Sequence, residues 1–286
     1  MADAIPAVEI VGLVKDFRTS FRRGMLRAVD GVSIRIQPGE VYGLIGPNGS
    51  GKSTTMKALL GLVAPTAGRC AIFGKDSLQV DSRQEVGFLP ENPYFYKHLS
   101  GVETLRFYGR LCGLRGRLLE DRVTELLALV DLTGARDRRI GGYSKGMLQR
   151  IGLAQALVQE PRLVILDEPT AGVDPVGSRQ IRDLIFKLRE QGITVFLCSH
   201  LLEQVQEVCD HVGIIFQGRM VKEGRLDDLI AIEDQTEIIL RDASPELVAQ
   251  ITALVAANPA AELVRTGKPR TTLERLFLRE TVRDDR

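Results

Sequence analysis

The stretch VYGLIGPNGSGKSTTMKALLGL, residues 41–62, decides the fold. Its first five residues predict a buried strand, and the glycine-rich turn after them leads directly into a helical pattern that ends near Gly61 and Pro65. A strand, a tight loop and a helix in immediate succession form the unit of a parallel α/β sheet. We therefore expect an α/β protein with a mainly parallel sheet at its core.

The loop within this stretch fits the pattern G-x-x-x-x-G-K-[ST]. Its glycines let successive backbone N–H groups turn inward around phosphate oxygens at a helix N-terminus. Lys52 would neutralise the β and γ phosphates, and Ser53 would bind Mg²⁺. An ordinary glycine-rich turn is the alternative, but the flanking strand and helix favour a nucleoside triphosphate site. The predicted site comprises Gly46, Pro47, Asn48, Gly49, Ser50, Gly51, Lys52, Ser53 and Thr54.

The composition is that of a folded protein with one large or two modest domains. The chain has 286 residues, and domains usually run to roughly 100 to 200. The 38 basic and 37 acidic residues nearly cancel, which argues against binding to the phosphate backbone of nucleic acid. No apolar run approaches the roughly 18 to 20 residues of a membrane helix, and the N-terminus does not read as a secretory signal. We expect a cytoplasmic protein that does not itself cross a membrane.

Further strands and helices are predicted on both sides of the loop. β-like runs occur at 7–11, 32–36, 69–73, 162–166, 193–198 and 212–216. The last three are short, continuous and β-branched, which suits strands buried on both faces. Residues 100–160 are mainly helical in pattern, with one apolar face predicted for Leu118, Leu119, Val123, Leu126, Leu127 and Val130.

The pattern changes after Gly224 to a mixture of alternating and helical segments, which include TEIILR at 236–241, PELVAQITALVAA at 245–257, AELVR at 261–265 and TLERLFLRETV at 272–282. We therefore expect a first domain over residues 1–225, with a helical subdomain at about 92–160, and a small α+β extension over 226–286. No internal repeat of the core is present in the sequence, so each chain has one nucleotide-binding unit.

An apolar strand that ends in two acids, LVILDEP at 163–169, narrows the chemistry. Asp167 and Glu168 would lie at the carboxyl edge of the sheet, where the phosphates also lie. Asp167 would hold Mg²⁺ through its water shell, and Glu168 would polarise an attacking water as general base. Such a strand end is more often a solvated edge when it occurs alone. Together with the phosphate-binding loop, it favours hydrolysis over phosphoryl transfer to a small molecule.

Four further segments complete a set of six. They are VGFLPEN at 86–92, YSKGMLQR at 143–150, AGVDP at 171–175 and CSH at 198–200. In this order they resemble the Q-loop, signature motif, D-loop and switch histidine of the ATP-binding cassette (ABC) ATPases, over roughly residues 7–225. The resemblance implies a P-loop NTPase cassette with a mainly parallel sheet core, an antiparallel β subdomain and a helical subdomain. It also implies ATP and Mg²⁺ as ligands.

The signature segment, residues 143–150, has a physical logic of its own. Ser144 is a good N-cap for the helix that follows, and Gly146 leaves room for an oxyanion near the first-turn N–H groups. From the residues alone this is only a capped helix. The resemblance implies that Ser144 and Gly146 close on the γ-phosphate held by a second subunit, so that two ATP molecules are sandwiched in a head-to-tail dimer. We expect a homodimer.

The resemblance assigns roles to three more residues. His200 would contact the γ-phosphate and orient the water and Glu168, although a lone histidine after a buried strand is more often structural. Asp174 would lie at the dimer interface and link the two sites. Phe17 lies where family members offer an aromatic ring to adenine, but Phe21 is a rival, and either ring could equally be core.

The chain departs from the family pattern at two motifs. Glu91 stands where most members carry glutamine, and its carboxylate could still approach Mg²⁺ or the attacking water. In the signature segment, Lys145 and Met147 replace the usual second glycine and the glutamine. These variants, and the closing LERLFLRET, resemble the bacterial ABC-2-type exporter ATPases, whose membrane partners are separate chains.

The leading functional hypothesis is therefore the ATP-hydrolysing subunit of an ABC transporter. It would power export through integral membrane permease subunits, as a peripheral protein on the cytoplasmic face of the cell membrane. The rival is a soluble ABC ATPase acting on nucleic acid or ribosomes, but the sequence has no tandem cassette, zinc cysteines or basic surplus. A non-hydrolysing nucleotide switch is disfavoured by Glu168 and His200 together.

The resemblance also places the membrane partner's docking site between Glu91 and about residue 140. This region contains Tyr94, Phe95, Tyr96, Phe107 and Tyr108. Core packing would account for about half of these rings. For the rest, we expect an exposed groove that accepts a partner helix.

Overall fold

The computed structural model describes residues 5–18, 24–231 and 240–258. The chain divides into two compact units, one ending at Ile230 and the other beginning at Ala231. The first unit therefore ends slightly later than the predicted boundary after residue 225, because the short helix α7 (Leu226–Ile230) follows directly on the last strand of the sheet and buries Leu226.

The central sheet of the first unit has six strands in the order β10-β9-β3-β8-β7-β6. Their bounds are β3 (Val41–Ile45), β6 (Val86–Leu89), β7 (Leu163–Asp167), β8 (Thr194–Ser199), β9 (His211–Phe216) and β10 (Arg219–Arg225). All neighbours pair in parallel except β9 and β10. The mainly parallel core is thus confirmed, with β7 and β8 buried on both faces.

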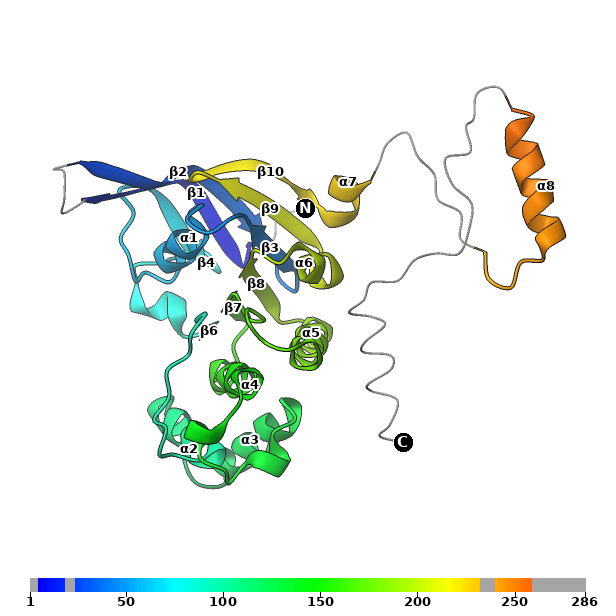
Figure 1. Ribbon diagram of the computed structural model, residues 1–286. Coiled ribbons are helices and arrows are strands. Elements are labelled where there is room, and N and C mark those ends of the chain that lie inside the picture. The colour runs from blue at the N-terminus through cyan, green and yellow to red at the C-terminus, as the bar shows by residue number, and fades with distance from the viewer. Residues whose placement is uncertain (1–4, 19–23, 232–239, 259–286) are drawn as a thin grey trace. The chain divides into compact units, whose positions relative to one another are not determined.

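A second sheet is antiparallel, in the order β2-β1-β4-β5. It comprises β1 (Val8–Arg18), β2 (Met25–Ile36), β4 (Ala67–Ile72) and β5 (Lys75–Asp76). The end of β2 alternates as its sequence predicts, because Val32, Ile34 and Ile36 are buried while Ser33 and Arg35 are exposed. Figure 1 shows this sheet beside the central one, with α1 (Lys52–Leu59) close to both.

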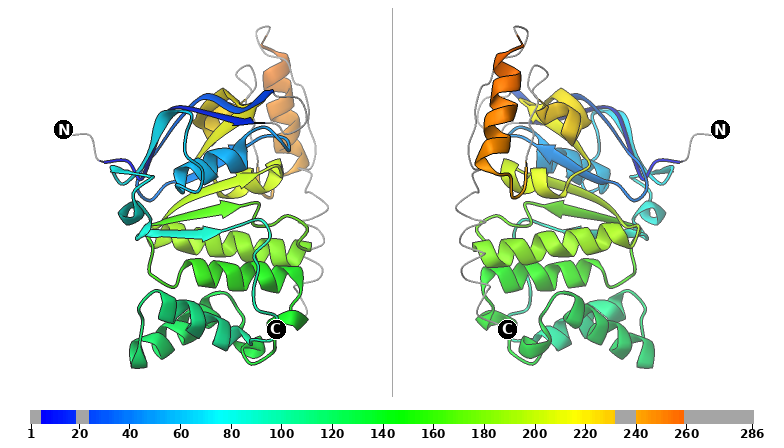
Figure 2. Two further views of the ribbon diagram at one scale, coloured as in Figure 1. Left: turned by 90° about the vertical axis from the view of Figure 1, so that its left-hand side faces the viewer. Right: turned by 90° about the vertical axis from the view of Figure 1, so that its right-hand side faces the viewer.

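The two faces of the central sheet carry separate apolar cores. On β7, Leu163 and Ile165 belong to the core shared with α1 and the antiparallel sheet, whereas Val164 and Leu166 belong to the core shared with the helices on the other face. These helices are α2 (Gly101–Leu111), α3 (Gly116–Leu129), α4 (Lys145–Ala156), α5 (Pro175–Glu190) and α6 (Leu202–Val208). Figure 2 shows the resulting layers, with α2 and α3 farthest from the antiparallel sheet.

The apolar face of α3 differs from the prediction at one residue. Leu119, Val123, Leu126, Leu127 and Val130 are buried, but Leu118 is 64% exposed. The buried set begins at residue 119 and recurs every three or four positions, so the preceding residue is rotated about 100° away from this stripe. Leu118 therefore belongs to the surface.

Two strands of the central sheet, β6 and β10, were absent from the sequence-based prediction, as was the two-residue β5 of the antiparallel sheet. β6 has only four residues, one of them glycine, and β10 reads RMVKEGR, with four charged residues. Neither shows the continuous β-branched pattern of a buried strand. β10 is polar because it is an edge strand whose side chains are largely exposed.

In the second unit, α8 (Pro245–Ala256) lies where a helix is predicted, and the Ser244 hydroxyl caps it by accepting from the Leu247 N–H at 3.2 Å. The predicted alternating segment 236–241 falls mainly outside the described residues. The predicted segments 261–265 and 272–282 fall wholly outside them.

Candidate nucleotide-binding site

The glycine-rich loop connects β3 to α1 and is shaped by two glycines. Gly51 has a φ of +108° and precedes the first helical residue, Lys52. A side chain at Gly51 would meet the Ala28 carbonyl oxygen at 2.6 Å, and one at Gly46 would meet the Ile215 backbone. The loop therefore requires glycine at both positions, because it is pressed against β2 and β9.

Lys52 is buried at the floor of this loop. Its Nζ donates to the Gly46 carbonyl at 2.6 Å and to the Pro47 carbonyl at 3.2 Å. The same Nζ lies 3.7 Å from Oε1 of Glu168, which follows β7. An ammonium group held by backbone carbonyls at a helix N-terminus makes this loop a site for anions.

Ser53 and Asp167 meet where α1 begins and β7 ends. The Ser53 hydroxyl donates to Oδ1 of Asp167 at 3.3 Å. Burial raises the pKa of Asp167; the Ser53 hydrogen bond opposes this, and the charges of Glu168 and Glu91 add to it. Within the described residues, no three His, Cys, Asp or Glu side chains form a ready metal site. Ser53 and Asp167 nevertheless fit Mg²⁺, because this cation usually takes one or two protein oxygens and completes its coordination with phosphate and water. Its positive charge would also offset the repulsion among the carboxylates of Asp167, Glu168 and Glu91.

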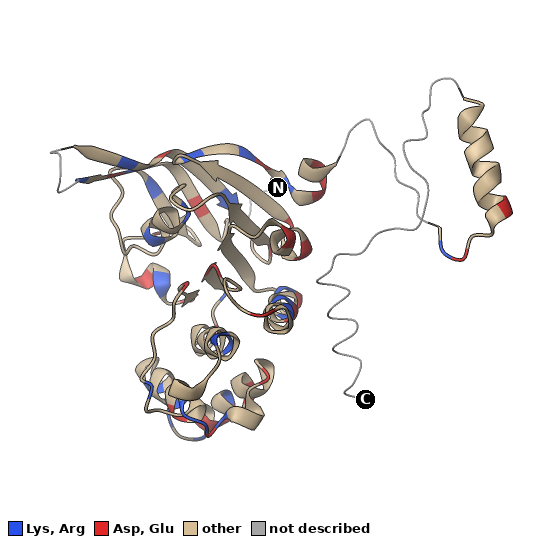
Figure 3. Ribbon diagram, viewed as in Figure 1, with Lys and Arg blue, Asp and Glu red and all other residues tan. Residues whose placement is uncertain are grey.

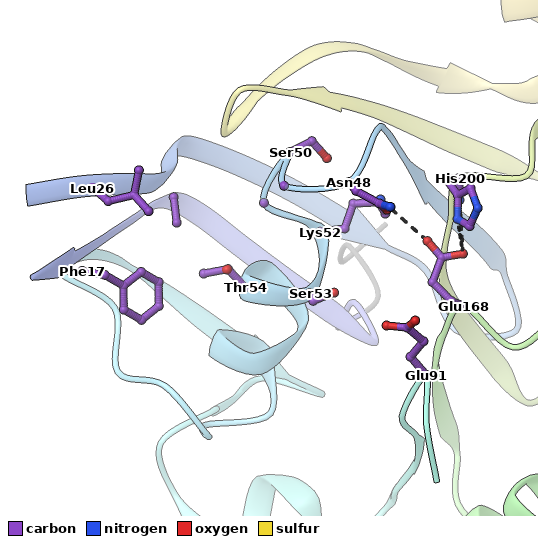
Figure 4. Close-up of a pocket in the computed structure, with 13 residues that line it drawn as sticks. Phe17, Leu26, Asn48, Ser50, Lys52, Ser53, Thr54, Glu91, Glu168 and His200 are labelled. Carbon is purple, nitrogen blue, oxygen red and sulfur yellow. Dashed lines mark hydrogen bonds and ion pairs between the residues drawn. The ribbon is translucent and has the colours of Figure 1, made fainter. Parts of the chain in front are cut away.

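Glu168 is fixed from the neighbouring strand. Its Oε2 accepts from the His200 N–H at 3.3 Å and the Ser199 hydroxyl at 3.4 Å, and lies 2.8 Å from Nδ1 of His200. The Glu168 backbone has a φ of +49°, a conformation that residues other than glycine seldom adopt. Such strain is found where a structure holds a functional side chain in place. Figure 4 shows Glu168 between Lys52 and His200.

A pocket of about 410 Å³ lies over the loop. Its lining contains most of the predicted residues, namely Phe17, Asn48, Gly49, Ser50, Gly51, Lys52, Ser53, Thr54, Glu91, Glu168 and His200. Of the two candidate rings, Phe17 is therefore at the pocket, whereas Phe21 lies outside the described residues. Gly46, Pro47 and Asp167 are absent from the lining but contact the side chains of Lys52 and Ser53.

Leu26 and Ala28 also line the pocket, and neither was predicted from the sequence. They lie on β2, where Leu26 is the cross-strand partner of Phe17. Arg27 links β2 to β1 at this point, since its guanidinium donates to Asp16 on β1 at 2.9 Å. It also donates to Asp30 on its own strand at 3.0 Å. The residues of β2 alone do not indicate that Leu26 belongs to the site, because only the strand register between β1 and β2 places it beside the Phe17 ring.

Glu91 reaches the pocket from the segment after β6. Its backbone carbonyl accepts from the buried Gln149 side chain at 2.8 Å. Gln149 lies on α4, so this bond ties the Glu91 segment to the signature helix. Figure 4 shows the Glu91 carboxylate directed toward the space between the loop and Glu168.

Three further predicted residues, Ser144, Gly146 and Asp174, do not line this pocket either. Ser144 caps α4 by accepting from the Met147 N–H at 3.3 Å, and Asp174 caps α5 by accepting from the Gly177 N–H at 2.9 Å. Gly146 is buried in the first turn of α4. The structure therefore places these residues together at the N-termini of two helices and apart from the loop of the same chain.

The fold and this site define the class, a P-loop nucleotide-binding protein. A model of the ABC transporter family matches residues 29–171. An uncharacterised ABC transporter ATP-binding protein of Synechocystis sp. is 36% identical over 96% of this chain and 84% of its own length. The bacitracin transport ATP-binding protein BcrA of Bacillus licheniformis is 38% identical over 72% of this chain and 67% of its own.

A solved structure with the same fold is the dimeric ATP-binding cassette MJ0796 bound to ADP and phosphate. Its TM-score is 0.70 at 24% identity, covering 77% of this chain and 98% of that one. From the family match and these relatives, the chain belongs to the ABC transporter family of ATP-binding proteins. It is the ATP-binding and ATP-hydrolysing subunit of an ABC transporter.

The alternative of an ATPase acting on nucleic acid is not favoured. Figure 3 shows basic and acidic residues on both the sheets and the helices of the first unit. Many form pairs of opposite sign, such as Arg106 with Glu120 and Arg162 with Glu85.

In the part of the chain that the structure describes, no helix has the length and apolar character of a membrane span.

Proposed function

We propose that this ATPase powers export through separate membrane subunits and works at the cytoplasmic face of the cell membrane. The observation that carries the proposal is the convergence of Lys52, Ser53, Glu168 and His200 around one pocket. Similarity to a bacitracin transport protein favours export. Because the membrane subunits of such a system select the substrate, the pocket of this chain would bind and hydrolyse ATP to drive transport.

The pocket supports a specific division of roles. The backbone N–H groups of residues 46–54 and the Lys52 ammonium would bind the phosphates, and the Phe17 ring would stack on adenine. Ser53 and Asp167 would hold Mg²⁺, with Glu91 near the same cation. Mg²⁺ would bridge the phosphate oxygens and neutralise developing charge. Glu168 would take the proton of the attacking water, and His200 would orient Glu168 and the γ-phosphate.

A second cassette would complete the site. Ser144, Gly146 and Asp174 lie away from the pocket of their own chain, which is the arrangement expected if they act on a nucleotide bound by a partner. The N-terminus of α4 would bring N–H groups and a positive dipole end to that γ-phosphate. Two copies of this chain would thus enclose two ATP molecules.

The membrane subunit would dock on the exposed aromatic cluster, which we define as Tyr94, Tyr96 and Phe107. Tyr94 is 83% exposed and Tyr96 is 52% exposed, whereas Phe95 is buried in the core. The Tyr96 and Phe107 rings make an edge-to-face contact with centroids 5.7 Å apart. An exposed aromatic surface in which Tyr96 and Phe107 pack against each other is suited to accept an apolar partner helix.

The test uses the full chain co-expressed with the membrane protein encoded beside it. ATP hydrolysis by the purified complex should drive solute movement in vesicles, and Glu168→Gln should abolish both. The double variant Tyr94→Ser/Tyr96→Ser should leave hydrolysis by the isolated chain unchanged and reduce its recovery with the membrane protein. Hydrolysis that proceeds normally in Glu168→Gln, or full recovery of the double variant with its partner, would contradict the respective assignment.

A further inference from the structure

The N-termini of α4 and α5 approach each other at two glycines. A Cβ built on Gly146 would lie 3.9 Å from the Cα of Gly177. Both glycines are buried, and neither has a positive φ. Backbone flexibility therefore does not explain them, and close packing does.

The side chain between these two helices is that of Val173. Its Cγ1 would lie 3.2 Å from a Cβ on Gly146 and 2.7 Å from a Cβ on Gly177. Both distances are shorter than ordinary contact between carbon atoms, which is about 3.5 to 4.0 Å. One valine thus occupies the space that a side chain at either glycine would need.

Val173 belongs to the turn that follows Glu168. The Ala171 N–H donates to the Glu168 carbonyl at 3.1 Å, and the Val173 N–H donates to the Thr170 carbonyl at 3.1 Å. The Val173 carbonyl accepts from the Ser178 hydroxyl of α5 at 3.4 Å. The turn therefore has little freedom to move independently of Glu168 or of α5.

The same turn contacts the helix that follows His200. The Thr170 hydroxyl donates to the Gln204 side chain on α6. Through this bond and the Val173 packing, the turn touches both the start of the signature helix and the helix next to His200.

We propose that Val173 is a positioning residue, which sets the N-terminus of α4 relative to the carboxyl end of β7 so that both are aligned when two cassettes close on ATP. The inference rests on the proposed dimer. Residue 146 would then have to be glycine because Val173 occupies the space of a side chain there, in addition to the oxyanion access that the sequence suggested. Gly177 supports this assignment, because oxyanion access offers no reason for a glycine there while Val173 contacts both positions.

The experiment measures ATP-dependent dimerisation of the full chain in a Glu168→Gln background, which removes turnover. Gly146→Ala, Gly177→Ala and Val173→Ala are made singly, and each glycine variant is also combined with Val173→Ala. Gly134→Ala is the matched control, because a Cβ at Gly134 would meet no atom within 4 Å. Thermal unfolding and ATP affinity of the monomer are measured for every variant.

Each glycine variant should weaken dimerisation by about tenfold, and Val173→Ala should recover about threefold or more in both, as expected for residues in direct contact. In the hydrolysing background the same pattern should appear in kcat, with KM for ATP unchanged. Gly134→Ala should match the parent. Recovery in both glycine variants, with monomer ATP affinity constant, would distinguish positioning from a general loss of folding.

Two results would overturn the inference alone: double variants that dimerise no better than the glycine variants, or a Gly177→Ala variant that behaves like Gly134→Ala. A parent that binds ATP but stays monomeric would instead contradict the dimer of the proposed function, and the inference with it.

Discussion

Nδ1 of His200 lies 2.8 Å from Oε2 of Glu168, so the residue that follows β8 holds the carboxylate that follows β7. The two strands are adjacent and parallel, and the Glu168 N–H donates to the Cys198 carbonyl at 2.9 Å. Side chains 32 residues apart in the chain thereby act as one unit.

His200→Ala should lower kcat by about tenfold to a hundredfold while ATP affinity is retained, because Glu168 loses the imidazole that orients it. Steady-state hydrolysis and nucleotide titration measure the two quantities. His98→Ala is the control, since His98 is exposed in the helical subdomain. Equal hydrolysis by the two variants would assign His200 a structural role only.

Lys52→Ala should weaken ATP binding by about thirtyfold, corresponding to about 2 kcal/mol for a lost charge-assisted contact. Isothermal titration with a slowly hydrolysed ATP analogue measures this. Lys57→Ala removes an exposed charge from the same helix and should change affinity little. An unaltered affinity in Lys52→Ala would contradict the phosphate-binding role.

Asp167→Asn should stabilise the nucleotide-free chain and abolish hydrolysis. Because burial raises the pKa of Asp167 above its ordinary value of 3.8, the ionised carboxylate destabilises the folded state at neutral pH. The gain in melting temperature should be a few degrees, at about 2–4 °C per kcal/mol for a chain of this size. Asn can still accept the hydrogen bond from Ser53.

The sign of the pH dependence follows from the raised pKa of Asp167. The stabilisation by Asp167→Asn should be complete above the folded-state pKa, should shrink as the pH falls through it, and should vanish below 3.8, where Asp167 is protonated in both states. Asp137→Asn, at an exposed position, is the charge-matched control. A gain that grows toward acid pH would refute the explanation.

Phe17→Ala and Leu26→Ala should each weaken ATP binding several-fold, by about 1 kcal/mol per lost apolar contact with the base. The phosphate contacts are unaffected, so inorganic pyrophosphate should compete equally well in both variants and the parent. Met25→Ala is the control, because Met25 is exposed on the same hairpin and does not line the pocket. A Leu26→Ala variant equal to Met25→Ala would remove Leu26 from the site.

Glu91→Gln should leave hydrolysis within about threefold of the parent if the position tolerates either side chain. Since the Glu91 charge raises the pKa of Asp167, the acid limb of the kcat/KM profile should move to lower pH in this variant. Glu85→Gln, which removes a charge paired with Arg162 away from the pocket, should not move it. Complete loss of hydrolysis would show that the carboxylate itself is required.

Local patterns and the resemblance of the six motifs predicted most of the fold and every residue that lines the pocket except Leu26 and Ala28. The buried strands β3, β7, β8 and β9 and the loop at 46–53 carry their signals in consecutive residues. β6 and β10 were missed because a short strand and a polar edge strand have no such signal. Leu26 was missed for a related reason, as its position beside Phe17 depends on hairpin register.

The sequence by itself determined the phosphate-binding loop, the acidic strand end and the order of six motifs, because each is a run of neighbouring residues with its own chemistry. Only the tertiary structure decided that Glu168 adopts a φ of +49° between Lys52 and His200, and that Val173 fills the space beside Gly146 and Gly177. These relationships join residues far apart in the chain, and they arise from the parallel pairing of β7 with β8 and the close approach of α4 to α5.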